Sequence, residues 1–267
     1  MPEGVEIRVM CDLINLNCRN KMLKNVNILS GRYTRHGNPE GYLSFRKNLP
    51  MKIKKAESYG KLLWILIGNW IIYIKLNMSG HILFYKNKHS HIEFKMNTDK
   101  FTFYLDDLRN FATIEFLKKD DFHKKVASMK LGYDIFDKKL NISYLEEKIK
   151  KYNMKKPKMI GEILMEQDFI AGIGNYMRSE ILYNSGISPY RKINMITKTH
   201  LQNILKNTKK IALKRYKRQL KEGVDICGHG GEKVKYIFDV YKRKRTNKNE
   251  HITSEKFKNK TGLRKIY

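Results

Sequence analysis

Residues 61–76 read KLLWILIGNWIIYIKL, two runs of aliphatic, β-branched and aromatic residues separated by Gly68-Asn69. Both residues of this pair tolerate a positive φ, which suits the primed turns of two-residue hairpins. The stretch therefore predicts a β-hairpin. Similar runs recur at short intervals on both sides of it, which is typical of an antiparallel sandwich. The predicted strands are 22–29, 52–58, 61–67, 70–76, 81–85, 91–96, 101–105 and 111–116.

Helical periodicity begins on either side of these strands. Val5, Val9, Leu13 and Leu16 share one face of a helix predicted over residues 3–17. From about residue 117 the hydrophobic period lengthens to near 3.6, and Ser143 with Glu146 forms a capping-box pattern that opens a helix. Further helices are predicted over 158–166, 176–184 and 197–220.

The order of these elements predicts an α+β fold with two domains. An N-terminal helix and a two-layer antiparallel β-sandwich occupy residues 1–133, and a helical domain occupies 134–267, with the linker near 131–139. Strands predicted at 236–241 and 263–267 would form a C-terminal hairpin within the segment of about 236–267.

The chain is strongly basic, with 55 Lys and Arg against 26 Asp and Glu, a formal net charge of +29 and a pI near 9.9. Neutralisation of phosphates releases counterions, so this charge favours a nucleic-acid partner, with an anionic membrane as the competing class. Residues 205–267 hold 20 Lys and Arg against 6 Asp and Glu. An A·T-rich coding sequence is the alternative explanation of the lysine content.

The composition also argues against several classes of protein. The longest apolar stretch, 62–74, is shorter than the roughly 20 residues of a membrane-spanning helix. The start, MPEGVEIRV, is acidic where a secretory signal is basic, so an intracellular location is expected. Cys11, Cys18 and Cys227 give neither a disulfide framework nor a C-x2-C metal spacing, which fits a reducing compartment.

The amino terminus contains a candidate nucleophile. Removal of the initiator Met would leave Pro2 with a secondary amine, which, unlike lysine, keeps a neutral fraction at physiological pH. Such an amine can attack a carbonyl-like carbon and form a Schiff base. Glu3 beside it can act as an acid or base. These two residues alone do not establish a catalytic site, because a chain can begin with Met-Pro without any catalytic role.

Residues 167–176, QDFIAGIGNY, form a second candidate site between two predicted helices. The glycines permit close approach of the backbone, and Asn175 stands where the second helix begins. Its side chain and the first N–H groups of that helix can converge on a phosphate. An ordinary glycine-rich connection with Asn175 as N-cap is the alternative.

Six further motifs occur along the chain: MPEGVE at 1–6, Tyr59-Gly60-Lys61, Asn77-Met78-Ser79-Gly80, Lys88-His89-Ser90-His91, Arg109-Asn110-Phe111 and AGIGNYMRSEIL at 171–182. Together they resemble the formamidopyrimidine-DNA glycosylase/endonuclease VIII family, in family order and over nearly the whole chain. The lack of a C-terminal four-cysteine zinc finger resembles the endonuclease VIII-like branch with a zincless finger, which includes a mimivirus enzyme of similar Lys-, Asn- and Ile-rich composition.

The resemblance implies catalytic roles near the start of the chain. Pro2 would be the nucleophile at C1′ of the damaged nucleotide, and Glu3 the general acid/base, with Glu6 supporting the lesion site. Lys61 would assist catalysis and contact a phosphate, although without the resemblance it is a solvated lysine at a strand edge. The other implied phosphate contacts are His91, Asn175 of a helix-two-turn-helix, and Arg264 at the tip of a finger hairpin.

Extrusion of a base leaves a gap in the duplex that side chains must fill. The resemblance implies that Met78, Arg109 and Phe111 fill it. Met and Phe can wedge between base steps, and Arg can hydrogen-bond the orphaned partner base. The alternative places Met78 and Phe111 in the core and makes Arg109 an ordinary surface charge.

The sequence departs from the family pattern at Val5, where Pro is usual, at Asn110, where Arg is usual, and in the short segment after Arg264. No metal is expected, because Cys227 and His229 offer only two of the four ligands of a closed zinc site. No cofactor is expected either, because covalent catalysis by an amine requires none.

The resemblance implies a bifunctional DNA glycosylase/AP lyase of base excision repair. It would be a monomer that excises oxidised pyrimidines and hydantoins from double-stranded DNA by β,δ-elimination, with a helix-two-turn-helix domain and a zincless finger at about 236–267. Oxidised-purine specificity, activity on single-stranded DNA, and a non-catalytic nucleic-acid-binding protein stay open as alternatives. A pure binder needs neither Pro2-Glu3 nor Gly60-Lys61. A membrane binder is disfavoured because residues 199–220 lack a broad aromatic face.

Overall fold

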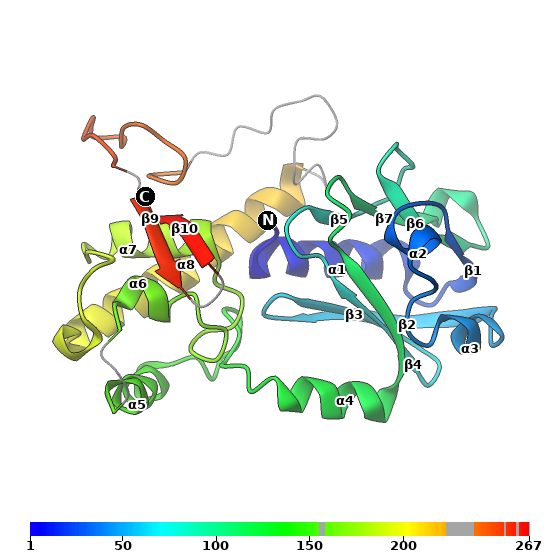
Figure 1. The fold of residues 1–267 in the computed structure, drawn as a ribbon, viewed down its shortest axis with the longest axis horizontal. Coiled ribbons are helices and arrows are strands. Elements are labelled where there is room, and N and C mark those ends of the chain that lie inside the picture. The colour runs from blue at the N-terminus through cyan, green and yellow to red at the C-terminus, as the bar shows by residue number, and fades with distance from the viewer. Residues whose placement is uncertain (155–157, 223–237, 254, 260–261, 267) are drawn as a thin grey trace. The chain divides into compact units, whose positions relative to one another are not determined.

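The computed structural model describes the chain except residues 155–157, 223–237, 254, 260–261 and 267. The chain forms two compact units, Met1–Lys130 and Leu131–Tyr267 (Figure 1). In the described part of the chain, no helix combines the length and the apolar character needed to span a bilayer.

The first unit is an N-terminal helix, α1 (Gly4–Cys18), followed by eight antiparallel strands in the order β5-β7-β6-β1-β2-β3-β4-β8. Its two four-stranded halves meet through only two residue pairs of β1 and β2. The predicted α+β class, first helix and eight strands are confirmed. The strands are β1 (Met22–Ile28), β2 (Met51–Tyr59), β3 (Leu62–Ile67), β4 (Trp70–Lys75), β5 (Gly80–Leu83), β6 (Ser90–Met96), β7 (Phe103–Asp107) and β8 (Thr113–Lys118), with α2 (Arg32–Arg35) and α3 (Tyr42–Arg46) after β1 and η1 (Asp99–Phe101) after β6.

The predicted central hairpin is β3 and β4, which pair from Leu63 with Ile74 to Ile67 with Trp70. Of its two turn residues, only Gly68 has a positive φ, of 57°. A single positive φ at the first turn position is what a type II′ turn requires, and glycine adopts it without steric cost. The hairpin is confirmed, and its turn depends on the glycine.

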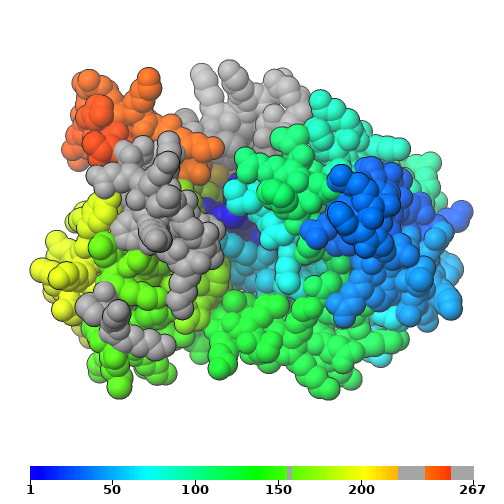
Figure 2. All heavy atoms as spheres, viewed as in Figure 1, coloured from blue at the N-terminus to red at the C-terminus, as the bar shows by residue number. Residues whose placement is uncertain are grey.

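Helix α4 (Lys119–Ser128) packs on one face of β3, β4 and β8, along the lower border of the sheet in Figures 1 and 2. Phe122 is 1% exposed, and its ring lies 5.2 Å from that of Trp64 and 5.4 Å from that of Tyr73. Because α4 covers this face, residues 70–74 of β4 are all buried and do not alternate with exposed positions.

We expect Phe122→Ala to lower the free energy of unfolding by about 3 to 5 kcal/mol, because it removes a ring from a packed cluster and leaves a cavity. Urea unfolding followed by tryptophan fluorescence measures the change, since Trp64 belongs to the same cluster. The control is Leu43→Ala, at a side chain 59% exposed, which should change stability by less than about 0.5 kcal/mol. Equal losses would show that α4 does not anchor the sheet.

The second unit is helical, and one helix start differs from the prediction. Helix α5 is capped by Asn141, whose side-chain oxygen accepts the N–H of Tyr144 at 2.9 Å, so Ser143 lies inside the helix and is not its cap. Asparagine caps at least as well as serine and stands two residues earlier. The helices are α5 (Ile142–Asn153), α6 (Ile160–Ile163), α7 (Asn175–Asn184), the short η2 (Ile193–Met195) and α8 (Lys198–Glu222).

The helix predicted over 158–166 is reduced to the single turn α6. Met159 forms an antiparallel β-bridge with Lys192, which holds the chain extended up to the start of α6. Beyond Ile163, the N–H of Glu166 donates back three residues, as in a tight turn, and the helix does not continue. Tertiary pairing therefore overrides the local helical pattern.

The C-terminal hairpin is formed by β9 (Glu255–Asn259) and β10 (Gly262–Ile266). Its first strand is predicted at 236–241, and this prediction is wrong for the described residues 238–241. The buried carboxylate of Glu180 accepts the N–H groups of Asp239, Val240 and Tyr241 at 2.8 to 2.9 Å. These donors are not available to a strand ladder.

Candidate functional site

The first turn of α1 holds two buried carboxylates next to Pro2. Pro2 is buried, and Glu3 and Glu6 are 1% and 4% exposed. Glu3 is the N-cap: its side chain accepts the N–H of Glu6, and its own N–H donates to Oε2 of Glu6 at 2.9 Å. This reciprocal capping box lies at the positive end of the helix dipole, which stabilises carboxylates. The residue beside Pro2 thus presents a carboxyl group in a fixed position.

Lys61 lies in the turn between β2 and β3 and is half-buried. Tyr59 pairs with Leu62, so the connection has two residues, and the first of them, Gly60, has a φ of 58°. The Gly60-Lys61 motif is therefore a hairpin turn that fixes the direction in which the lysine leaves the sheet.

Helix α1 runs along β2 in a regular register. Asn15 exchanges hydrogen bonds with the backbone of Ala56 at 2.7 and 2.9 Å, and one turn earlier Cys11 bonds Ser58. Four helical residues advance by about 6 Å and two strand residues by about 6.6 Å, so helix and strand stay in step. Continued by two turns, this register brings the start of α1 to the β2–β3 turn, at the same end of the unit (Figure 1). The start of α1 and the β2–β3 turn thus lie at the same end of the first unit.

Two cysteines on α1 are further potential nucleophiles. Cys11 and Cys18 are both buried, and burial raises the pKa of both thiols, that of Cys18 to about 12. A thiol in this state stays protonated at physiological pH and is a poor nucleophile. These two side chains therefore do not compete with an amine at Pro2.

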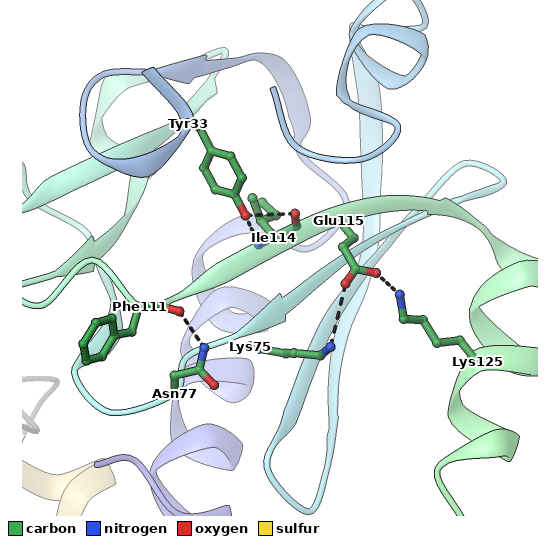
Figure 3. Close-up of polar contacts among 7 residues, drawn as sticks. All are labelled: Tyr33, Lys75, Asn77, Phe111, Ile114, Glu115 and Lys125. Atoms are coloured by element: carbon green, nitrogen blue, oxygen red, sulfur yellow. Dashed lines mark hydrogen bonds and ion pairs between the residues drawn. The ribbon is translucent and has the colours of Figure 1, made fainter. Parts of the chain in front are cut away.

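The three predicted gap-filling residues lie on two neighbouring turns of the first unit. Met78 follows β4, and Arg109 and Phe111 lie between β7 and β8. Met78 and Phe111 are 43% and 52% exposed, so the alternative that they are core residues is wrong. Asn77 donates from Nδ2 to the carbonyl of Phe111 at 2.6 Å, which ties the two turns (Figure 3).

Two other residues of this region are engaged inside the protein. Asn110 has a φ of 55°, which asparagine tolerates, and its Oδ1 accepts the N–H of Arg32 at 3.2 Å. His91, a predicted phosphate contact, has Nε2 2.9 Å from the carbonyl of Asp107 and Nδ1 2.8 Å from the hydroxyl of Ser30. A carbonyl only accepts, so Nε2 carries the proton. A phosphate contact by His91 would have to displace one of these bonds.

In the second unit, the glycine-rich loop leads directly into α7. The side chain of Gln167 accepts the N–H of Gly172 at 3.0 Å, and Gly172 has a φ of 103°. Asn175 is the first residue of α7, and Gly174, not Asn175, is the N-cap. The Asn175 oxygen instead accepts a hydrogen bond from the buried guanidinium of Arg178. Asn175 thus stands at a helix N-terminus, where an anion is stabilised, with a cation beside it.

The C-terminal candidates are described in part. Arg264 lies in β10 opposite Phe257 of β9, two residues after the strand begins. Cys227 and His229 lie outside the described residues. Within the described ranges, no group of three or more His, Cys, Asp or Glu side chains is arranged to hold a metal ion.

Two family models match this chain. The formamidopyrimidine-DNA glycosylase N-terminal domain matches residues 1–114, and the formamidopyrimidine-DNA glycosylase H2TH domain, the helix-two-turn-helix, matches residues 131–224. Both domains of one family thus occur in order and cover most of the chain. The chain belongs to the formamidopyrimidine-DNA glycosylase family.

Relatives within this family are distant. A formamidopyrimidine-DNA glycosylase of Bacillus cereus is 30% identical over 162 residues, which are 59% of this chain and 57% of that protein. One of Ureaplasma parvum is 27% identical over 220 residues, 80% of this chain and 78% of that protein. The chain therefore matches little more than half the length of the Bacillus cereus relative.

Solved structures of formamidopyrimidine-DNA glycosylases share the fold over almost the whole length. The Lactococcus lactis protein in complex with abasic-site DNA has a TM-score of 0.79 at 19% identity and covers 99% of this chain and 97% of its own. The same protein with DNA containing an oxidised pyrimidine has a TM-score of 0.80 at 20% identity, with the same coverage. MutM with DNA containing a carbocyclic 8-oxo-G has a TM-score of 0.78 at 18% identity, again covering 99% and 97%.

Asp107 is absent from the predicted site, although its carboxyl group bonds both turns that hold the predicted gap-filling residues. Its Oδ1 accepts the hydroxyl of Ser79 and the N–H of Arg109. An Asp at a strand end that bonds the N–H two residues ahead is a recognised turn signal, which the sequence contains at 107–109. The link to Ser79, 28 residues away, has no local signal.

Proposed function

We propose that this chain is a bifunctional DNA glycosylase and AP lyase of base excision repair that acts through the amine of Pro2. The observation that carries the proposal is the capping box at the start of α1, which fixes the buried Glu3 carboxyl beside Pro2. A buried carboxyl group held beside an amine is placed to transfer protons at the reacting centre, and buried titratable groups of this kind are typical of functional sites. The match to both domains of the family supports the same assignment.

In the proposed mechanism, Met1 is removed and the lone pair of the Pro2 nitrogen attacks C1′ of the damaged nucleotide. The bond from C1′ to the base breaks and the nitrogen loses its proton; the C1′–O4′ bond then opens, which leaves an iminium between C1′ and the Pro2 nitrogen. Glu3 transfers the protons that these steps require, including the one that O4′ takes up. The iminium acidifies the C2′ proton. Its loss breaks the bond to the 3′ phosphate by β-elimination, and δ-elimination then breaks the bond to the 5′ phosphate.

The proposed partner is damaged double-stranded DNA, bound by a monomer. Lys61 would contact the phosphate beside the extruded nucleotide, because its turn lies at the Pro2 end of the first unit. In the second unit, Asn175 at the start of α7 would bind the DNA backbone, with Arg264 of β10 as a further contact. Met78 and Phe111 are exposed apolar side chains of the kind that wedge between base steps.

We propose an endonuclease VIII-like preference for oxidised pyrimidines and hydantoins, with 8-oxoguanine a poor substrate. A chain with three cysteines lacks the four of a four-cysteine zinc finger, which supports the zincless-finger branch. Lesion preference follows from pocket contacts, so it needs a direct measurement.

The test is single-turnover excision from matched duplexes that carry thymine glycol, a hydantoin or 8-oxoguanine. We expect the first two to be processed at least about tenfold faster than 8-oxoguanine. A preference for 8-oxoguanine would contradict the branch assignment and leave the chemistry intact. Salt-sensitive binding without any strand cleavage across all three lesions would contradict the enzyme and favour a non-catalytic DNA-binding protein.

A further inference from the structure

Asp107 joins the two turns that carry the gap-filling residues. It is the last residue of β7 and is completely buried. Its Oδ1 accepts the hydroxyl of Ser79 and, at 3.1 Å, the N–H of Arg109, while its Oδ2 accepts the N–H of Ala112 at 2.6 Å. Its backbone carbonyl accepts the N–H of Asn110 at 3.0 Å. One buried carboxylate therefore fixes both the beginning and the end of the 107–112 turn.

Met78 is bracketed by two residues that bond this same turn. On its N-terminal side, Asn77 donates to the carbonyl of Phe111 at 2.6 Å (Figure 3). On its C-terminal side, the Ser79 hydroxyl donates to Asp107 and also accepts the N–H of Arg109 at 3.2 Å. Because both neighbours of Met78 are bonded across, its backbone is fixed relative to the 107–112 turn.

The same turns expose large apolar side chains above this buried polar layer. Leu108 is 52% exposed, as is Phe111, and Met78 is 43% exposed. Exposed apolar side chains on unsupported turns would gain by folding back onto the protein. The hydrogen bonds from Ser79, Arg109 and Ala112 to the buried Asp107 side chain beneath the turns oppose that collapse.

We propose that Asp107, Ser79 and Asn77 are positioning residues that together hold Met78, Arg109 and Phe111 as one preformed wedge. The proposal rests on the proposed function and adds the group that makes base extrusion efficient. A wedge that is already ordered avoids the entropic cost of arranging these side chains when the base leaves the stack. Asp107 itself does not need to touch the DNA.

The experiment compares thymine glycol in a fully paired duplex with thymine glycol in a small unpaired bubble, where little stacking has to be replaced. Asn77→Asp is the main variant, because it is isosteric, lies on the surface and tolerates the φ of 51° at this position, yet loses the donor to Phe111. Ser79→Ala removes the second link, and Ser79→Thr restores a hydroxyl. Asp99→Asn, at a carboxylate side chain 83% exposed in the same unit, is the control.

We expect kcat/KM on the paired substrate to fall about tenfold in Asn77→Asp and Ser79→Ala, and by less than about twofold on the bubble. Ser79→Thr should recover most of the loss, and Asp99→Asn should match the unaltered protein on both substrates. An equal fall on both substrates, or no fall on either, would overturn the positioning role. If the unaltered protein cleaves neither substrate, the proposed function fails, which is a separate and distinguishable result.

Discussion

Protein that retains Met1 is expected to cleave lesion-containing DNA at least about 10³-fold more slowly than protein with a free Pro2 nitrogen. Retention makes that nitrogen part of a tertiary amide, whose lone pair is delocalised into the carbonyl and does not attack carbon. Single-turnover strand cleavage of a thymine glycol duplex measures the difference. Protein made with an N-terminal extension that is not cleaved has a blocked Pro2 nitrogen in every molecule. Mass spectrometry verifies the blocked and the free form.

The blocked form also provides its own folding control. Met1 is 41% exposed, and the capping box of α1 is complete with Met1 in place, so retention does not disturb the first unit. Binding to an undamaged duplex should therefore be unchanged. Pro2→Gly after Met1 removal should keep part of the activity, because it still offers a free amine. Full activity in the blocked form would exclude the terminal amine as nucleophile.

Glu3→Gln is expected to lower base excision by about 10² to 10⁴-fold with little effect on DNA binding. The glutamine oxygen can still accept the N–H of Glu6, so the helix keeps its cap, but the side chain no longer transfers a proton. Single-turnover release of the base measures the loss. The matched control is Glu57→Gln, at a side chain 40% exposed in the same unit.

Two other results would argue against this role of Glu3. Base release within about twofold of the unaltered protein would mean that another group transfers the protons. An equal loss in Glu3→Gln and in the Glu57→Gln control would point to a general effect of charge on this basic chain.

The helix and strands of the first unit can be predicted from the sequence, because the residue patterns that specify them are local. Residues 61–76 are two runs of aliphatic, β-branched and aromatic residues, and Gly68 supplies the one positive φ that the turn between them needs. The N-terminal helix has its cap and its partner, Glu3 and Glu6, within one turn. Such patterns depend on neighbours in the chain, which a single sequence displays.

The errors occur where distant residues decide the structure. Residues 238–241 have the composition of a strand, but the carboxylate of Glu180, about 60 positions earlier, accepts the N–H groups of residues 239–241. The helix predicted after 158 is shortened by the bridge of Met159 with Lys192. Neither partner can be chosen from the sequence, because each depends on how α7 and its loops pack.

The residues of the candidate site also differ in whether local sequence patterns can identify them. Pro2, Glu3 and Asn175 can be named from short motifs, because each lies at a helix start. Asp107 cannot, because its role appears only when the turn with Ser79 is brought beside it by the pairing of β5 with β7. Motifs identify the residues that touch substrate more readily than those that hold them in position.

The most direct test of the account is to trap the enzyme–DNA intermediate with borohydride on a thymine glycol duplex and to map the adduct by peptide mass spectrometry. The account predicts one covalent adduct, located on the Pro2 nitrogen and absent from protein that retains Met1. An adduct on Lys61 or another lysine, or an adduct of equal yield in the blocked form, would contradict it.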